Sequence, residues 1–156
     1  MKTRQLAFGL ALLCLPCSVW AQQVASRCPT LPSASGLQWV EKASVGFIAC
    51  KARSPDGSQS LNLMLTSRDP DIRLLRSQRT ESGVFSGAAF HWYIPELVGR
   101  ADEYAASRRI TVLKLGKDQY AQIWIDAQSP EALGKLQSMV SQMDASAGTQ
   151  YLVSGK

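Results

Sequence analysis

Apolar and polar side chains alternate along residues 59–67, which is the pattern of a β-strand that buries one of its faces. Successive side chains of a strand point to opposite sides of the sheet. One side of this strand should therefore face a core, and its members are Leu61, Leu63 and Leu65. Two shorter apolar stretches, 37–42 and 45–52, precede it. The Ser-Pro-Asp-Gly-Ser turn at 54–58 predicts a hairpin between the second stretch and 59–67.

A second hairpin is predicted near the end of the chain. The β-rich runs 109–115 and 119–126 flank a Gly-Lys-Asp turn, which is typical of two antiparallel strands. In the second run Ile123 and Ile125 alternate with Trp124. This alternation predicts one face toward the core and one face from which a tryptophan projects.

The best helix signal begins at Ser129. Serine is a good N-cap, Pro130 suits the first helical position, and Glu131 complements the positive end of the helix dipole. Apolar residues then follow at helical spacing, so we expect a helix that runs to Asp144. They are Leu133, Leu136, Val140 and Met143.

The middle of the chain gives weaker signals. Residues 72–80 follow Asp-Pro-Asp and fit a short helix or a strand, and the pattern does not separate the two. Two glycines then indicate a loop, namely Gly83 and Gly87. Residues 88–94 are rich in aromatic strand formers, 95–107 contains helix formers, and 151–153 could add an edge strand.

Hairpins with helices between and after them predict an α+β fold. We expect an antiparallel sheet of about five or six strands with two or three helices packed on one face. The predicted organisation is a signal peptide over 1–21, an extended segment over 22–36 that contains two prolines, and a single α+β domain over 37–156.

The first 21 residues have the three regions of a secretory signal peptide. Lys2 and Arg4 precede an apolar run at 6–15, and Pro16 ends that run before the expected cleavage site near Ala21. A membrane-spanning helix needs about 20 apolar residues, so no stable membrane anchor is expected. We therefore expect a periplasmic or secreted protein.

The cysteines agree with an exported protein. Cleavage near residue 21 removes two of the four and leaves Cys28 and Cys50, an even pair for which a disulfide is the default in an oxidising compartment. The alternative, a redox or nucleophilic thiol, is disfavoured because the chain after residue 21 has no Cys-x-x-Cys motif and no nearby histidine.

Cleavage also lowers the formal net charge of the chain from +5 to +3, which falls short of the dense basic footprint of a nucleic-acid binder.

The sequence offers few residues for a catalytic site or a metal site. His91 is the one histidine, and no Gly-x-Ser-x-Gly elbow accompanies it. A zinc site would need more His or Cys ligands than remain. The acid pairs have local explanations, a helix start for Asp69 with Asp71 and a solvated helix face for Asp102 with Glu103. We expect no enzyme activity and no cofactor.

Binding residues are the better candidates. Arg73, Arg76 and Arg79 are spaced to share one face if 72–80 is helical, where they could grip an acidic protein or an anionic envelope polymer. Trp92 and Trp124 could project as binding anchors, with core or sheet packing as the alternative.

These residues predict a small exported protein that binds a partner protein. By analogy of size and compartment, it could be an immunity protein or an inhibitor that neutralises a toxin or a cell-wall hydrolase. The alternatives are an envelope accessory module that binds lipid, glycan or peptidoglycan or supports a secretion or transport assembly, and an enzyme that uses His91.

Overall fold

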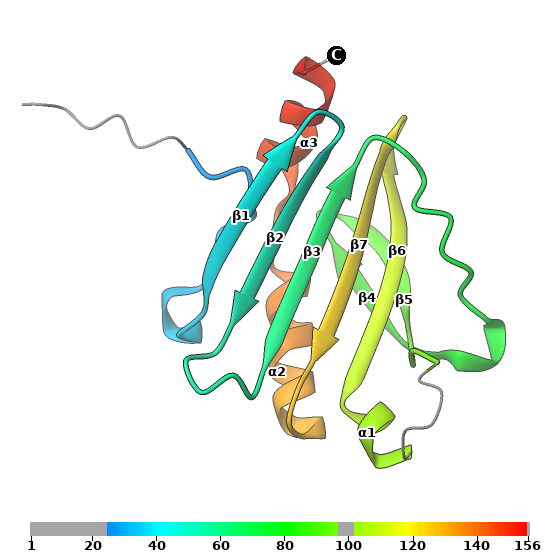
Figure 1. The fold of residues 1–156 in the computed structure, drawn as a ribbon. Coiled ribbons are helices and arrows are strands. Elements are labelled where there is room, and N and C mark those ends of the chain that lie inside the picture. The colour runs from blue at the N-terminus through cyan, green and yellow to red at the C-terminus, as the bar shows by residue number, and fades with distance from the viewer. Residues whose placement is uncertain (1–24, 97–101, 156) are drawn as a thin grey trace, which may run out of the picture.

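The computed structural model describes residues 25–96 and 102–155. The expected signal peptide over 1–21 lies outside them. In the described residues seven strands form one antiparallel sheet in the order β1-β2-β3-β7-β6-β5-β4 (Figure 1). The strands are β1 (Gln38–Ser44), β2 (Phe47–Arg53), β3 (Ser60–Thr66), β4 (Arg79–Phe85), β5 (Ala88–Tyr93), β6 (Arg108–Gly116) and β7 (Gln119–Asp126).

The helices of the described chain are α1 (Asp102–Ala106), α2 (Pro130–Ser141) and α3 (Ser146–Ser154), with short 3-10 turns η1 (Ser33–Ser35) and η2 (Arg76–Gln78). In Figure 1, α2 and α3 lie behind the sheet, and α2 contacts both β4 and β7. The α+β prediction is confirmed, with seven strands in place of five or six.

Two parts of the sheet differ in how they are joined. Strands β1, β2, β3, β7 and β6, here called the main sheet, pair in register along nearly their whole length. Strands β4 and β5 form a hairpin that joins β6 at one registered pair, Tyr93 with Ile110. In Figure 1 this β4–β5 hairpin turns behind the main sheet, so that α2 contacts both parts.

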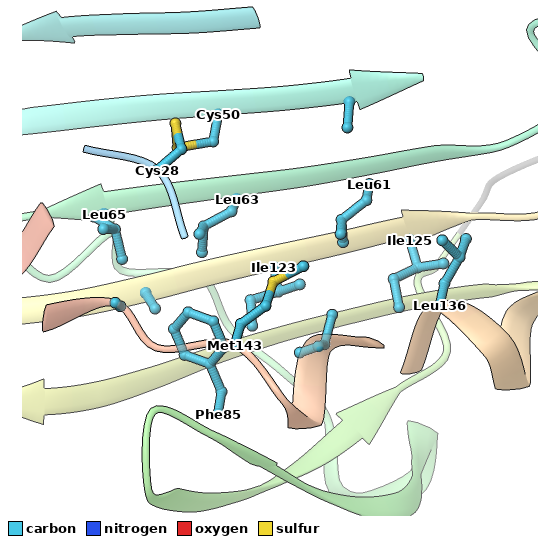
Figure 2. Close-up of a cluster of buried hydrophobic side chains, with 14 of the residues drawn as sticks. Cys28, Cys50, Leu61, Leu63, Leu65, Phe85, Ile123, Ile125, Leu136 and Met143 are labelled. Carbon is cyan, nitrogen blue, oxygen red and sulfur yellow. A yellow bond between two sulfur atoms is a disulfide. The ribbon is translucent and has the colours of Figure 1, made fainter. Parts of the chain in front are cut away.

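The core lies between the main sheet and α2 (Figure 2). The alternation predicted for β3 and β7 is confirmed, because its leucines and isoleucines are buried while Trp124 is on the other face. Phe85, at the end of β4, brings a fully buried ring into the same core. The buried residues of the central strands and α2 are Leu61, Leu63, Leu65, Ile123, Ile125, Leu133, Leu136 and Val140.

The helix predicted from Ser129 is confirmed over Pro130–Ser141. The Ser129 hydroxyl accepts a hydrogen bond from the backbone N–H of Ala132 at 3.2 Å, which satisfies one of the free donors at the helix start. The chain leaves the helix at Gln142, two residues before the expected end at Asp144.

Residues 72–80 do not form one helix or one strand, because only 79–80 belong to a strand. Apart from the 3-10 turn η2, the chain from 67 to 78 has no regular structure, and β4 begins at Arg79. The Asp69 side chain accepts from the N–H of Asp71 at 3.0 Å, and Asp71 has a φ of 51°. That left-handed residue directly after Pro70 prevents a helix from starting there.

Gly83 belongs to β4 and not to the predicted loop. A Cβ atom at this position would lie 2.7 Å from the ring of Phe90 and 3.0 Å from the indole nitrogen of Trp92. Glycine is required here because aromatic rings cross the strand closely. The strand therefore depends on tertiary packing that the local sequence does not reveal.

Two further predictions differ from the structure. Residues 151–153 lie in α3 and do not form an edge strand, because Gly148 and Leu152 face the core at helical spacing. The helix expected over 95–107 is present as Asp102–Ala106, while 97–101 lies outside the described residues.

The N-terminal segment is fixed to the sheet by a covalent bond and by a carboxylate. Cys28 and Cys50 form the predicted disulfide, which indicates an oxidising compartment. Burial opposes the charge of Glu41, but hydrogen bonds from Ser26, Arg27 and the N–H of Cys28 outweigh it and hold its pKa below the usual value.

None of the helices in the described part of the chain is long and apolar enough to span a membrane.

Candidate binding face

The side of the main sheet that faces away from α2 and α3 is the candidate site, and we call it the open face (Figure 1). Its residues follow from the strand register, because side chains of paired residues on neighbouring strands stand on the same side. The helix-facing side contains the buried row of Cys50, Leu63 and Ile123. Positions one residue away along each strand therefore belong to the open face.

One cross-strand row of the open face contains Trp124. Asn62 of β3 pairs with Trp124 of β7, and Trp124 pairs with Ile110 of β6. On the other side, Asn62 pairs with Lys51, which pairs with Val40 of β1. The tryptophan thus has a lysine two strands away in the same row, and Asn62 of the central strand β3 lies between them.

The next row is less bulky and forms a shallow hollow. It contains Ala49, Met64 and Gln122, paired across β2, β3 and β7. Together with Lys51, Asn62 and Trp124 they line a depression of about 200 Å³. A side chain of a partner can enter this hollow and contact the tryptophan.

The open face exposes apolar side chains that the core does not use. Val40 is 65 % exposed, Phe47 40 % and Met64 39 %, each on a different strand. Scattered exposed apolar residues are ordinary on a protein surface. Here they share one sheet face with a half-buried tryptophan, which is the composition of an interface centre.

The charge of the open face is mainly positive. Lys42, Lys51 and Arg53 form no ion pair with any described residue. Lys114 stands over the Tyr120 ring at 5.8 Å. Asp126, the acid that the register places on this face, is paired with Arg108 at 2.8 Å. The unpaired charges therefore favour an anionic partner.

The structure separates the predicted binding residues. Trp124 is on the open face, and Arg79 continues its row at the far edge through Tyr93 and Ile110. Trp92 is 2 % exposed and packs edge-on against Phe90 with ring centroids 4.8 Å apart, so it is a core residue and not a projecting anchor.

The other two predicted arginines lie apart from the open-face rows. Arg73 and Arg76 are exposed in the 67–78 connector between β3 and β4. Because the connector is not a helix, the three arginines do not form the stripe that helical spacing would give.

His91 lies on the β4–β5 hairpin beside two polar groups. Its Nε2 contacts a guanidinium nitrogen of Arg79, and its Nδ1 lies 3.4 Å from the hydroxyl of Ser82. The imidazole therefore lies between a guanidinium and a hydroxyl, one beside each ring nitrogen.

Of the two acid pairs, the one with described side chains belongs to a turn. Asp69 and Asp71 are exposed in the turn described above. The side chains of Asp102 and Glu103 lie outside those that the structure describes. Within the described residues there is no group of three or more His, Cys, Asp or Glu side chains that could hold a metal ion.

Sequence reasoning missed a polar contact that fixes the hairpin. Both carboxylate oxygens of Glu81 accept from the buried guanidinium of Arg109, at 2.6 and 2.8 Å. This hydrogen bonding holds the pKa of Glu81 at about 2, well below its usual value.

Gln137 of α2 donates to the same carboxylate of Glu81 at 3.3 Å. The partners are 28 and 56 residues away in sequence, so no local signal reveals them.

Comparison with known proteins adds no relative. Family models, curated proteins and solved structures give no match to this chain. The functional argument therefore depends on the open face itself.

Proposed function

We propose that this is an exported, non-enzymatic binding protein that docks an acidic partner protein on its open face. The single observation that supports this is the open face, where Trp124 and exposed apolar side chains share one surface with cations of β1 and β2 that have no ion pair with a described residue. A desolvated aromatic centre with complementary charge around it is the usual basis of specific protein binding.

The charge of the open face also indicates what does not bind there. A second copy of the chain would bring its own lysines against Lys42 and Lys51, and like charges opposed across an interface are costly. An acidic protein surface with an apolar centre satisfies both the cations and the hollow beside Trp124.

The specific function that we propose is neutralisation of a harmful enzyme, as an immunity protein or inhibitor acts on a toxin or cell-wall hydrolase. A rigid sheet suits this role, because a preorganised surface spends little conformational entropy on binding. The disulfide between Cys28 and Cys50 adds to that rigidity.

The test begins with the purified protein immobilised in an extract of the compartment to which it is exported. The retained protein is then purified, and its dissociation constant is measured for the wild type and for two open-face variants, Trp124→Ala and Lys51→Glu. We expect each variant to weaken binding by roughly 30-fold or more, as for a central hot spot. Added salt should weaken wild-type binding.

The matched control is Lys135→Glu, which makes the same charge change on α2, behind the sheet. It should leave the dissociation constant unchanged. An equal loss in this variant would show that binding depends on total charge and not on the open face. Retention of only glycan, lipid or another anionic envelope polymer would replace the proposal by the accessory-module alternative.

A further inference from the structure

The β4–β5 hairpin carries a second cluster of polar groups, on the side that continues the open face beyond β6. Ser82 and His91 are a cross-strand pair, and Arg79 lies next to them at the start of β4. The imidazole joins the other two groups, since one ring nitrogen contacts Arg79 and the other lies 3.4 Å from Ser82. A guanidinium, a hydroxyl and an imidazole from two strands thus meet at one place.

No carboxylate of the described residues neutralises this cluster. Arg79 has no ion pair with any of them. Glu81 is close in sequence but points to the other side of the hairpin, where Arg109 binds both of its oxygens. A guanidinium that is held beside an imidazole and a hydroxyl, without an acid of its own, is suited to an external anion.

Apolar groups lie directly beside the polar ones. The next cross-strand pair on the same side is Val84 with Ala89, and Val84 is 44 % exposed. These residues line a hollow of about 490 Å³ together with Ser82, Gly83, Phe90, His91 and Ser141 of α2. The hollow has room for the carbon skeleton of a small ligand or of one amino-acid side chain.

We propose that Arg79, Ser82 and His91 form a carboxylate-binding site for ligands whose carboxylate is attached to an apolar group. Arg79 is the one permanently charged group of the cluster, so it matches a carboxylate better than a doubly charged phosphate. The carboxylate accepts from the guanidinium and the Ser82 hydroxyl, and the apolar group enters the hollow beside Val84. The source is a free aromatic or aliphatic acid, or the C-terminus or an acidic side chain of a protein.

The single histidine of the chain gives a direct readout, because its imidazole signals in an NMR spectrum have one assignment. The full protein is titrated with benzoate, and with benzamide as the uncharged analogue, at constant ionic strength. We expect saturable shifts of the His91 imidazole and of the Val84 and Ala89 amides with benzoate, and none with benzamide.

Arg79→Gln should weaken benzoate binding by about tenfold or more, which is the usual effect of losing a charge-assisted hydrogen bond. The matched control is Arg76→Gln, which removes the same charge from the neighbouring connector and should leave the affinity unchanged. Ser82→Ala gives a second variant that keeps the net charge and should weaken binding by a smaller factor.

Equal shifts with benzamide, or an equal loss in Arg76→Gln, would overturn the proposal, as would shifts that do not saturate. A short peptide with a free C-terminus, the same peptide amidated, and one with an internal aspartate then identify the source of the carboxylate. Trp124→Ala should leave benzoate binding intact, so the failure of this site and the failure of the open-face proposal are distinguishable.

Discussion

The main sheet and the β4–β5 hairpin belong to one sheet but are held by different forces. The main sheet is joined by continuous backbone ladders, which depend little on which side chains are present. The hairpin meets β6 at one registered pair, and the N–H of Ser86 in its turn donates to the Met143 carbonyl at 3.2 Å. Much of its remaining attachment comes from side-chain contacts. They include the buried ring of Phe85, the Glu81–Arg109 pair and the bond from the Thr111 hydroxyl to the His91 carbonyl at 2.9 Å.

This difference indicates which part of the molecule a single substitution can destabilise locally. A single substitution can weaken the attachment of the hairpin, because a small number of side chains supply much of it. The same kind of substitution on the open face of the main sheet leaves the ladders in place. Binding variants of the main sheet should therefore remain folded, whereas hairpin variants need a test of local stability.

The largest expected effect comes from removing the disulfide, which ties the N-terminal segment to β2 in the main sheet. The double substitution Cys28→Ser and Cys50→Ser should lower the free energy of unfolding by about 3 kcal/mol, because the unfolded chain regains the entropy of a loop with a separation of 22 residues. Urea unfolding of both proteins measures the difference. A loss below about 1 kcal/mol would mean that Glu41 and its hydrogen bonds suffice to hold the segment.

The next effect concerns the packing of α3 on the main sheet. A Cβ atom at Gly148 would lie 2.4 Å from a methyl of Leu65 and 2.7 Å from the backbone oxygen of Arg27. Gly148→Ala should therefore cost about 1–3 kcal/mol of stability through overpacking.

The matched control for that substitution is Gly134→Ala in α2, where nothing lies within 4 Å of the added carbon. It should raise stability by about 0.5–1 kcal/mol, since alanine favours a helix over glycine. Thermal unfolding of both variants measures the sign of each stability change. The same sign for both would contradict the close approach of α3 to the sheet.

A smaller effect should be confined to the hairpin. Glu81→Gln removes the charge that pairs with Arg109 and should destabilise the hairpin by about 1 kcal/mol at neutral pH, because the carboxylate is partly exposed. Amide hydrogen exchange in β4 and β5 measures this local loss, with the amides of β2 and β3 as the internal control. Equal acceleration in all four strands would contradict a separately held hairpin.

The same pair predicts a pH dependence. The folded pKa of Glu81 is about 2, below the unfolded value, so its stabilisation is complete above the unfolded pKa near 4.5. It is lost as the pH falls toward 2. The difference between wild type and Glu81→Gln should therefore be largest at neutral pH and vanish near pH 2, as measured by hydrogen exchange or chemical denaturation.

The smallest effect is expected in the connector between the two parts. Arg76→Gln replaces an exposed side chain that has no ion pair with the described residues, so the stability should change by less than about 0.5 kcal/mol. Urea unfolding checks this value. A larger loss would show that the connector braces the hairpin.

Elements with complete local signals were predictable from the sequence. The strands with alternating leucines and isoleucines and the capped helix α2 carry their own pattern, because burial and capping act within one element. Strand β4 was missed because most of its residues are polar or glycine, and it forms only where Glu81 meets Arg109 and where Phe90 crosses Gly83.

The site was only partly predictable for the same reason. Alternation placed Trp124 on the non-core face, but its row with Asn62 and Lys51 depends on the pairing of β3 with β7, which joins distant segments. The run Phe90-His91-Trp92-Tyr93 is aromatic on both sides, so periodicity could not show that Trp92 faces inward. Partner geometry between strands is set by topology and is not encoded in any single strand.

The inward position of Trp92 also gives the hairpin an optical label. An indole enclosed by protein emits at shorter wavelength than one in water, so release of the hairpin should red-shift the Trp92 part of the fluorescence, which adds to the emission of Trp39 and Trp124 in the main sheet. Circular dichroism in the far ultraviolet is dominated by the longer ladders. Recording both signals during one denaturant titration would therefore show whether the two parts melt together or in sequence.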